Sequence, residues 1–133
     1  MGGDDADMNA TPGIDRYALD YGWGHEPGWT DETEITLLGV IQGEAATTAV
    51  REWVASLPES ELPRERGRHY HGGATMEIVE DGPSGMRLAL RSVGEDAFDS
   101  VSWYADVVAD LVTEPGDPAT TLTWTQLPFG AKP

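Results

Sequence analysis

Alternation of apolar and polar side chains predicts most of the strands of this chain. Residues 74–79 and 86–91 each repeat with a period of two, which is typical of a strand with one buried face. The turn-forming residues 81–85 (DGPSG) lie between them and predict a hairpin. Residues 120–126 (TTLTWTQ) alternate in the same way and predict a further strand. Earlier in the chain, residues 34–41 (EITLLGVI) are nearly all apolar, which favours a central strand buried on both faces.

Two other segments have the 3.6-residue apolar period of an amphipathic helix. Residues 44–57 form the first, and Pro58 is expected to end it. The second begins near Asp96 and ends before Pro115. Asp96 and Asp99 resemble a capping box in which aspartate replaces glutamate, and this predicts where the helix starts.

The N-terminal region is predicted to contribute one more strand. Its alternation places four large side chains on one face, those of Tyr17, Leu19, Tyr21 and Trp23. Residues 1–13 are acidic, glycine-rich and without periodicity, and we expect them to form a disordered tail. Residues 129–133 are expected to form a C-terminal tail, which leaves residues 14–128 as a single domain.

The elements follow the order β, β, α, β, β, α, β and predict an α+β fold. The last six match the ferredoxin-like split β-α-β arrangement, with two helices on one face of an antiparallel sheet. The N-terminal strand would lie beside that sheet. A length of 133 residues fits one domain, because two cores of half that size would each be marginal.

Composition excludes several classes of function. The chain has 24 acidic residues against 8 Lys and Arg, a formal net charge of −16, so we expect neither direct nucleic-acid nor membrane binding. It has no cysteine, which excludes disulfides and thiolate metal sites. The acidic first residues do not resemble a signal peptide, and together with the absent cysteines they favour the cytoplasm. Three explanations of the acidity stay open: solubility, adaptation to a salty cell, and recognition of a basic partner.

One face of the second predicted helix combines acid with a tryptophan. Asp99, Trp103, Asp106 and Asp110 are spaced by four, three and four residues, which places them on one side, opposite the apolar stripe. Carboxylates there would steer a basic protein partner, and the indole would anchor it. The alternative is that the N-terminal aromatic segment or a loop covers Trp103.

The histidines are candidates for a metal site. His69 and His71 would lie on the same side of an extended strand, and His25 from a loop would complete three nitrogen ligands for zinc. Arginines at positions 64, 66 and 68 oppose this interpretation, because they repel a divalent cation. We therefore expect no cofactor.

The sheet face away from the helices is expected to be polar. It would carry Thr75, Glu77, Arg87, Arg91, Thr121, Thr123 and Thr125. This face is either solvated surface or a shallow binding platform, and Glu77 and Arg87 suit a cross-strand ion pair better than catalysis. It shows no paired carboxylates and no nucleophile beside a base, so no catalytic residue is predicted.

These observations favour a non-enzymatic module that binds a basic protein through its acidic surface. An immunity-type or antitoxin-type inhibitor of a nuclease-like toxin is one form of such a module. The alternative is a domain that binds a small ligand or metal, or acts as an enzyme, through the polar sheet face and His25, His69 and His71. A homodimer with Trp103 or the N-terminal strand at its interface is a third alternative.

Overall fold

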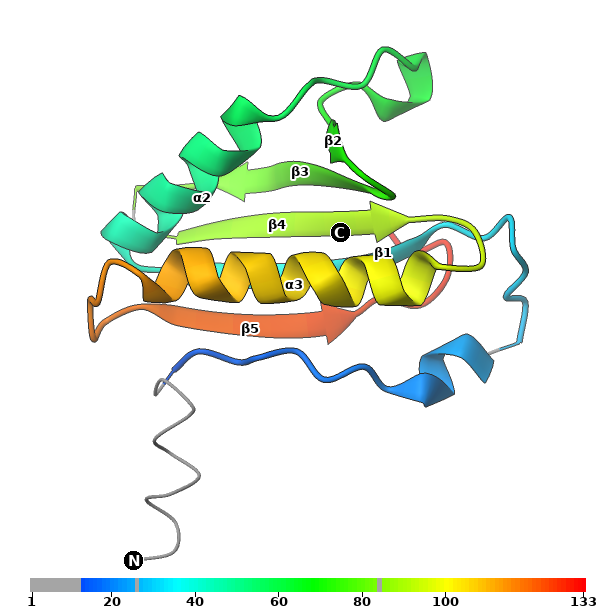
Figure 1. Cartoon of the computed structure of the whole chain (residues 1–133), viewed down its shortest axis with the longest axis horizontal. Coiled ribbons are helices and arrows are strands. Elements are labelled where there is room, and N and C mark those ends of the chain that lie inside the picture. The colour runs from blue at the N-terminus through cyan, green and yellow to red at the C-terminus, as the bar shows by residue number, and fades with distance from the viewer. Residues whose placement is uncertain (1–12, 26, 84) are drawn as a thin grey trace, which may run out of the picture.

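The protein is an antiparallel sheet covered on one face by two helices (Figure 1). The computed structural model describes residues 13–25, 27–83 and 85–133. The strands are β1 (Ile35–Gln42), β2 (His69–His71), β3 (Ala74–Asp81), β4 (Gly85–Ser92) and β5 (Thr121–Gln126). The helices are α2 (Glu44–Ser56) and α3 (Ala97–Thr113), with short 3-10 helices η1 (Tyr21–His25) and η2 (Pro63–Glu65). The predicted α+β class is confirmed.

The five strands lie in the order β2-β3-β4-β1-β5, and all pairs are antiparallel. β1 is central, as its apolar sequence predicted, because β4 and β5 pair with its two edges. The order is not that of a four-stranded split β-α-β sheet, because β2 adds an edge strand beside β3. The strand added to the four-stranded arrangement is therefore β2, and it lies at the edge of the sheet opposite to β5. Gly72, with a φ of 56°, turns the chain from β2 into β3.

The core lies between the sheet and the two helices. Leu37, Leu90 and Met76 pair across three adjacent strands and are all fully buried. The helices cover this row with small and β-branched side chains, namely Ala46 and Val50 of α2 and Val101, Ala105 and Val108 of α3. Burial of apolar area stabilises such a core by about 25 cal/mol per Å². Neither helix of the described residues combines the length and apolar character that a membrane crossing requires.

The predicted N-terminal strand is wrong. Only Ile14 forms a bridge, parallel to Leu122, and the path from there to η1 contains no strand. The backbone bonds to β5 end at Asp15, and further along the chain turns at Asp20, whose side-chain and backbone oxygens accept hydrogen bonds from the backbone N–H groups of Gly22 and Trp23. Such capping by a short acidic side chain competes with a strand ladder. The tail predicted for residues 1–13 lies, except for Gly13, outside the described residues.

Trp23 attaches this N-terminal segment to the domain. Its indole is 2% exposed, and its Nε1 donates a hydrogen bond to the carbonyl of Leu127 at 3.2 Å. The ring also packs edge-on against Phe98 of α3 and is stacked on Phe129. Residues 129–133, predicted as a tail, thus begin with a side chain that packs against the core.

Two local predictions are also wrong. Asp96 precedes α3 but makes no side-chain capping bond; instead the N–H of Ala97 donates to the carbonyl of Gly94 at 3.1 Å. Glu77 does not pair with Arg87, because a bulge between Ile78 and Glu80 shifts the register and brings Glu80 opposite Arg87. Glu77 pairs with Arg91 instead, at 2.6 Å.

Replacing Gly39 by alanine is expected to destabilise the centre of the sheet. Gly39 lies opposite Trp124, and an added Cβ would lie 2.7 Å from Cζ3 of that ring. The ring is held by a hydrogen bond from its Nε1 to the carbonyl of Asp15 at 3.0 Å. We expect Gly39→Ala to lower the free energy of unfolding by about 1–3 kcal/mol in urea titrations. Gly85→Ala is the control, since its Cβ would have its nearest neighbour at 3.6 Å, and equal losses in both variants would contradict the packing argument.

Tyr17 is expected to make stability depend on alkaline pH. Burial raises the pKa of Tyr17 to about 12, and its hydroxyl donates a hydrogen bond to Gln126. An unfolded tyrosine ionises near a pH of about 10, so the folded protein holds this proton more tightly. The stabilisation is complete below a pH of about 10 and is lost as the pH rises through about 12. Tyr17→Phe should reduce the slope of unfolding free energy against pH in that window, and identical slopes would disprove the assignment.

Candidate functional site

The predicted acidic face of α3 is open to solvent. Trp103 is 68% exposed, so no described segment covers it. Asp99, Asp106 and Asp110 are exposed on the same side of the helix. The four predicted residues therefore share one accessible surface, and a large indole left in water is the feature that distinguishes it from an ordinary solvated helix.

Arg16 partly neutralises this face. Its guanidinium donates a hydrogen bond to Asp110 and lies 3.5 Å from a carboxylate oxygen of Asp106. The hydrogen bond to Asp110 is the largest cause that raises the pKa of Arg16 above its ordinary value. The three side chains are exposed, so this contact is screened by water and salt. The N-terminal segment thus supplies a cation to the carboxylates of this face.

The acidic character extends over the outer surface of both helices. A groove of about 650 Å³ between α2 and α3 is lined by Glu52 and Glu114 without any basic residue. Glu44 and Glu52 line a neighbouring hollow on α2 together with Asp117. We call this surface, with the α3 face, the acidic helix layer. Its field is of one sign and attracts cations.

His69 and His71 contact other groups of the domain in the structure. The described residues contain no group of three His, Cys, Asp or Glu side chains that would bind a metal ion. His69 contacts the carbonyl of Leu57 through Nδ1 at 2.8 Å, whereas His71 contacts the hydroxyl of Tyr104 at 2.6 Å. The His69 ring thus contacts the residue that follows α2, and the His71 ring contacts a side chain of α3. Each imidazole already has a hydrogen-bond partner within the domain. Burial raises the pKa of the Tyr104 hydroxyl, which keeps that hydroxyl neutral.

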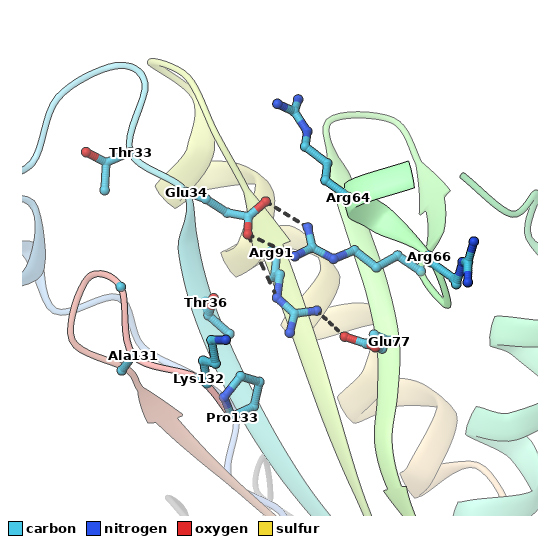
Figure 2. A pocket seen from close by; sticks show the side chains of 12 residues that line it. Thr33, Glu34, Thr36, Arg64, Arg66, Glu77, Arg91, Ala131, Lys132 and Pro133 are labelled. Carbon is cyan, nitrogen blue, oxygen red and sulfur yellow. Dashed lines mark hydrogen bonds and ion pairs between the residues drawn. The ribbon is translucent and has the colours of Figure 1, made fainter. Parts of the chain in front are cut away.

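The sheet face away from the helices carries a cavity that the residue pattern did not predict. Its volume is about 520 Å³, and Figure 2 shows it between the ends of β1, β3 and β4, the η2 segment and the C-terminal residues. Its charged lining consists of Arg64, Arg66, Arg68, Arg91 and Lys132 with Glu34 and Glu77. We call it the arginine pocket. It collects five of the eight basic residues of a chain whose net charge is −16.

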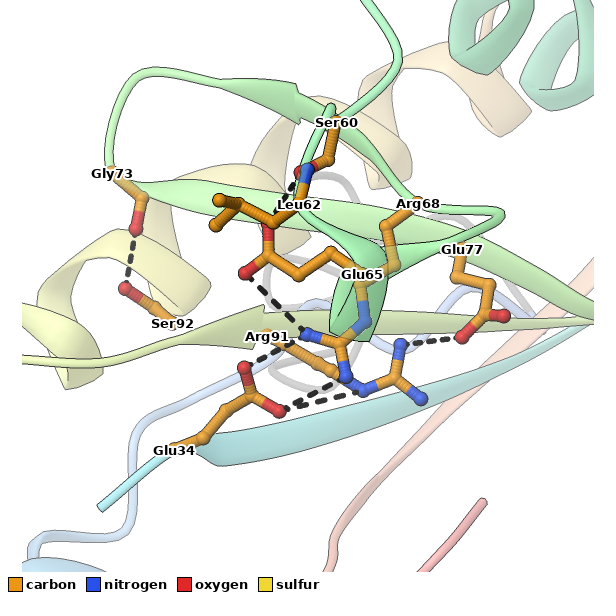
Figure 3. Close-up of polar contacts among 9 residues, drawn as sticks. All are labelled: Glu34, Ser60, Leu62, Glu65, Arg68, Gly73, Glu77, Arg91 and Ser92. Atoms are coloured by element: carbon orange, nitrogen blue, oxygen red, sulfur yellow. Dashed lines mark hydrogen bonds and ion pairs between the residues drawn. The ribbon is translucent and has the colours of Figure 1, made fainter. Parts of the chain in front are cut away.

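Two carboxylates organise the floor of the arginine pocket, as Figure 3 shows. Glu34 accepts two hydrogen bonds from Arg68, at 2.8 and 3.2 Å, and lies 3.9 Å from Nε of Arg91. Glu77 accepts a hydrogen bond from Nη1 of Arg91 at 2.6 Å. Glu65 adds a weaker contact to Arg68 at 3.9 Å. This network joins β1, β3, β4 and the η2 segment, and holds the two floor arginines in place.

The sequence contained one signal of this pocket. Arg64, Arg66 and Arg68 alternate along the chain, and Arg91 lies on the predicted polar face. The three alternating arginines were interpreted as a reason against metal binding, because they repel a cation. Nothing in the local sequence pattern predicted that Arg91 or Lys132 would line a pocket with them. Those contacts arise from strand register and from the path of the C-terminal residues.

Comparison with protein-family models, with curated proteins and with solved structures gave no match for this chain.

Proposed function

We propose that this protein is a non-enzymatic module that docks onto a basic protein through the acidic helix layer. The observation that carries the proposal is the 68% exposure of Trp103 among the exposed carboxylates of α3. A buried interface needs an anchor that loses water on binding, and tryptophan is one of the residues most enriched at such positions. The surrounding carboxylates supply the orientation and the encounter rate.

Charge complementarity supports a basic occupant. Within α2 and α3, the only basic residue is Arg51, and its guanidinium is held by Asp81 at 2.8 Å. The layer therefore presents carboxylates without competing cations, apart from Arg16. A cytoplasmic inhibitor of a nuclease-like toxin is one form of this function, because nucleic-acid-binding surfaces are basic.

We also propose that the fold is the ferredoxin-like split β-α-β arrangement extended by β2. The support is the order of β1, α2 and β3 followed by β4, α3 and β5 around one hairpin. An experimentally determined structure in which β4 does not lie between β3 and β1 would exclude it. This arrangement hosts many unrelated functions, so it adds nothing to the choice of partner.

Trp103→Ala is expected to abolish partner capture while leaving the fold intact. Wild type and variant are used to capture proteins from a lysate of the source cell at low and high salt, and the retained basic protein is identified and purified. Loss of an anchor of this kind weakens binding by about 30-fold, from a free-energy loss of about 2 kcal/mol. Calorimetric titration of the purified pair measures this change.

Leu62→Ala is the matched control for that experiment, since Leu62 is an exposed apolar residue, at 49%, outside the helix layer. It should bind the partner like wild type. Equal affinities of wild type and Trp103→Ala for the partner would contradict the proposal, as would a captured protein with an acidic surface.

Arg16→Ala is expected to strengthen partner binding. Arg16 occupies Asp106 and Asp110 in the free protein, so its removal frees two carboxylates for the partner's cations. We expect an affinity gain of about two- to fivefold at low salt, and a stability loss of about 0.5 kcal/mol or less, as for other exposed pairs. Arg87→Ala, which breaks the exposed pair of Arg87 with Glu80 between β4 and β3, outside the helix layer, is the control and should leave the affinity unchanged. A weaker partner complex with Arg16→Ala would show that Arg16 belongs to the interface.

A further inference from the structure

We propose that the arginine pocket is a second site, which binds a small molecule through a phosphate group. The pocket lies on the sheet face opposite to the acidic helix layer, so it does not depend on the function proposed above. Its volume of about 520 Å³ is within the range of roughly 300–1,000 Å³ found for small-ligand sites. Its charge is opposite to that of the whole chain, which is the first argument for a ligand.

The floor of the pocket presents unused donors on a buried cation. The side chain of Arg91 is 8% exposed, yet among the described residues only its Nη1 donates a hydrogen bond, to Glu77. A guanidinium has five N–H donors in a rigid fork. Glu77 and Glu34 therefore fix the position of Arg91 but leave donors on the pocket side. None of these nitrogens is among the buried side-chain atoms that lack a partner in the described residues, so they reach the solvent of the pocket, where a ligand oxygen can accept from them.

The rim of the pocket adds cations that have no carboxylate partner. No acidic group of the described residues lies within 4 Å of the charged nitrogens of Arg64, Arg66 or Lys132. Figure 2 shows the side chains of Arg64 and Arg66 at the rim, with their guanidinium groups directed away from the Glu34–Arg91 cluster, so a ligand would have to draw them inward. In a chain with 24 acidic residues, three unpaired cations around one cavity contrast with the pairing of Arg16, Arg51 and Arg87 elsewhere.

The charged side chains that line the pocket favour a ligand with a phosphate group. The five cations outnumber Glu34 and Glu77 of the lining, also when Glu65 beside Arg68 is counted, and this excess of positive charge favours an anionic ligand. Arginine forks match the paired oxygens of phosphate, and charge-assisted hydrogen bonds of this kind are about twice as strong as neutral ones. Thr36 lines the same cavity and carries a hydroxyl group for a further oxygen of the ligand, whereas the hydroxyl of Thr33 already donates to the carbonyl of Gly28. A phosphate monoester or diphosphate group fits these features.

Calorimetric titration with sodium pyrophosphate and inorganic phosphate tests the proposal, with ionic strength held constant by sodium chloride. We expect saturable binding of one pyrophosphate per chain and weaker binding of phosphate. Arg66→Gln and Lys132→Gln should each weaken pyrophosphate binding by about five- to tenfold, because each removes one charged contact. Both residues are exposed and unpaired, so the variants are expected to retain the melting temperature of wild type.

Arg87→Gln is the matched control. It removes the same charge from the same sheet face, but Arg87 pairs with Glu80 and does not line the pocket. Unchanged pyrophosphate affinity in this variant supports a defined site, and a loss equal to that of Arg66→Gln would overturn it in favour of diffuse attraction. Absence of saturable binding at millimolar pyrophosphate would also overturn the proposal. Tighter binding of citrate than of pyrophosphate would reject phosphate as the recognised group.

Discussion

The place of β1 inside the sheet, with both helices packed on one of its two faces, is the constraint on which the rest of the structure depends. β1 is hydrogen-bonded along both edges, and its even and odd side chains face opposite sides. Ile35, Leu37 and Ile41 point to the helices and are fully buried. Because alternation has a period of two, this choice also decides that Thr36, and Arg91 opposite it, lie on the other face. The position of the arginine pocket follows from the packing of the core.

The same constraint separates the charges of the molecule. α2 and α3 bury their apolar stripes against the sheet, so their polar sides, which carry Glu52, Asp99 and Asp110, face solvent together. The sheet face behind them collects most of the cations. A protein with a net charge of −16 thus has an acidic layer and a cationic pocket on opposite faces. The net charge of the chain predicted only the acidic layer. The acidic layer suits a positively charged ligand and the cationic pocket a negatively charged one.

Local patterns predicted the elements but not the contacts of longer range. The β3–β4 hairpin and both helices lie close to their predicted residues, because periodicity of 2 or 3.6 residues reports directly which side of an element is buried. The N-terminal alternation of Tyr17 to Trp23 was misleading, since Asp20 turns the chain, and Trp23 is buried in the core whereas Tyr17 and Leu19 are only partly buried. The pairing of Arg87 with Glu80 depended on a bulge that no sequence pattern indicated.

The sequence by itself determined the α+β class, the apolar face of each element, and the shared side of Asp99, Trp103, Asp106 and Asp110 on α3. These are properties of residues a few positions apart, and backbone geometry relates them without reference to the rest of the chain. Only the tertiary structure decided that Trp103 stays exposed, that Arg16 reaches the α3 carboxylates, and that Lys132 and Arg91 lie beside Arg66. Those contacts join residues far apart in sequence, so they depend on strand register and on how the two terminal segments cross the domain.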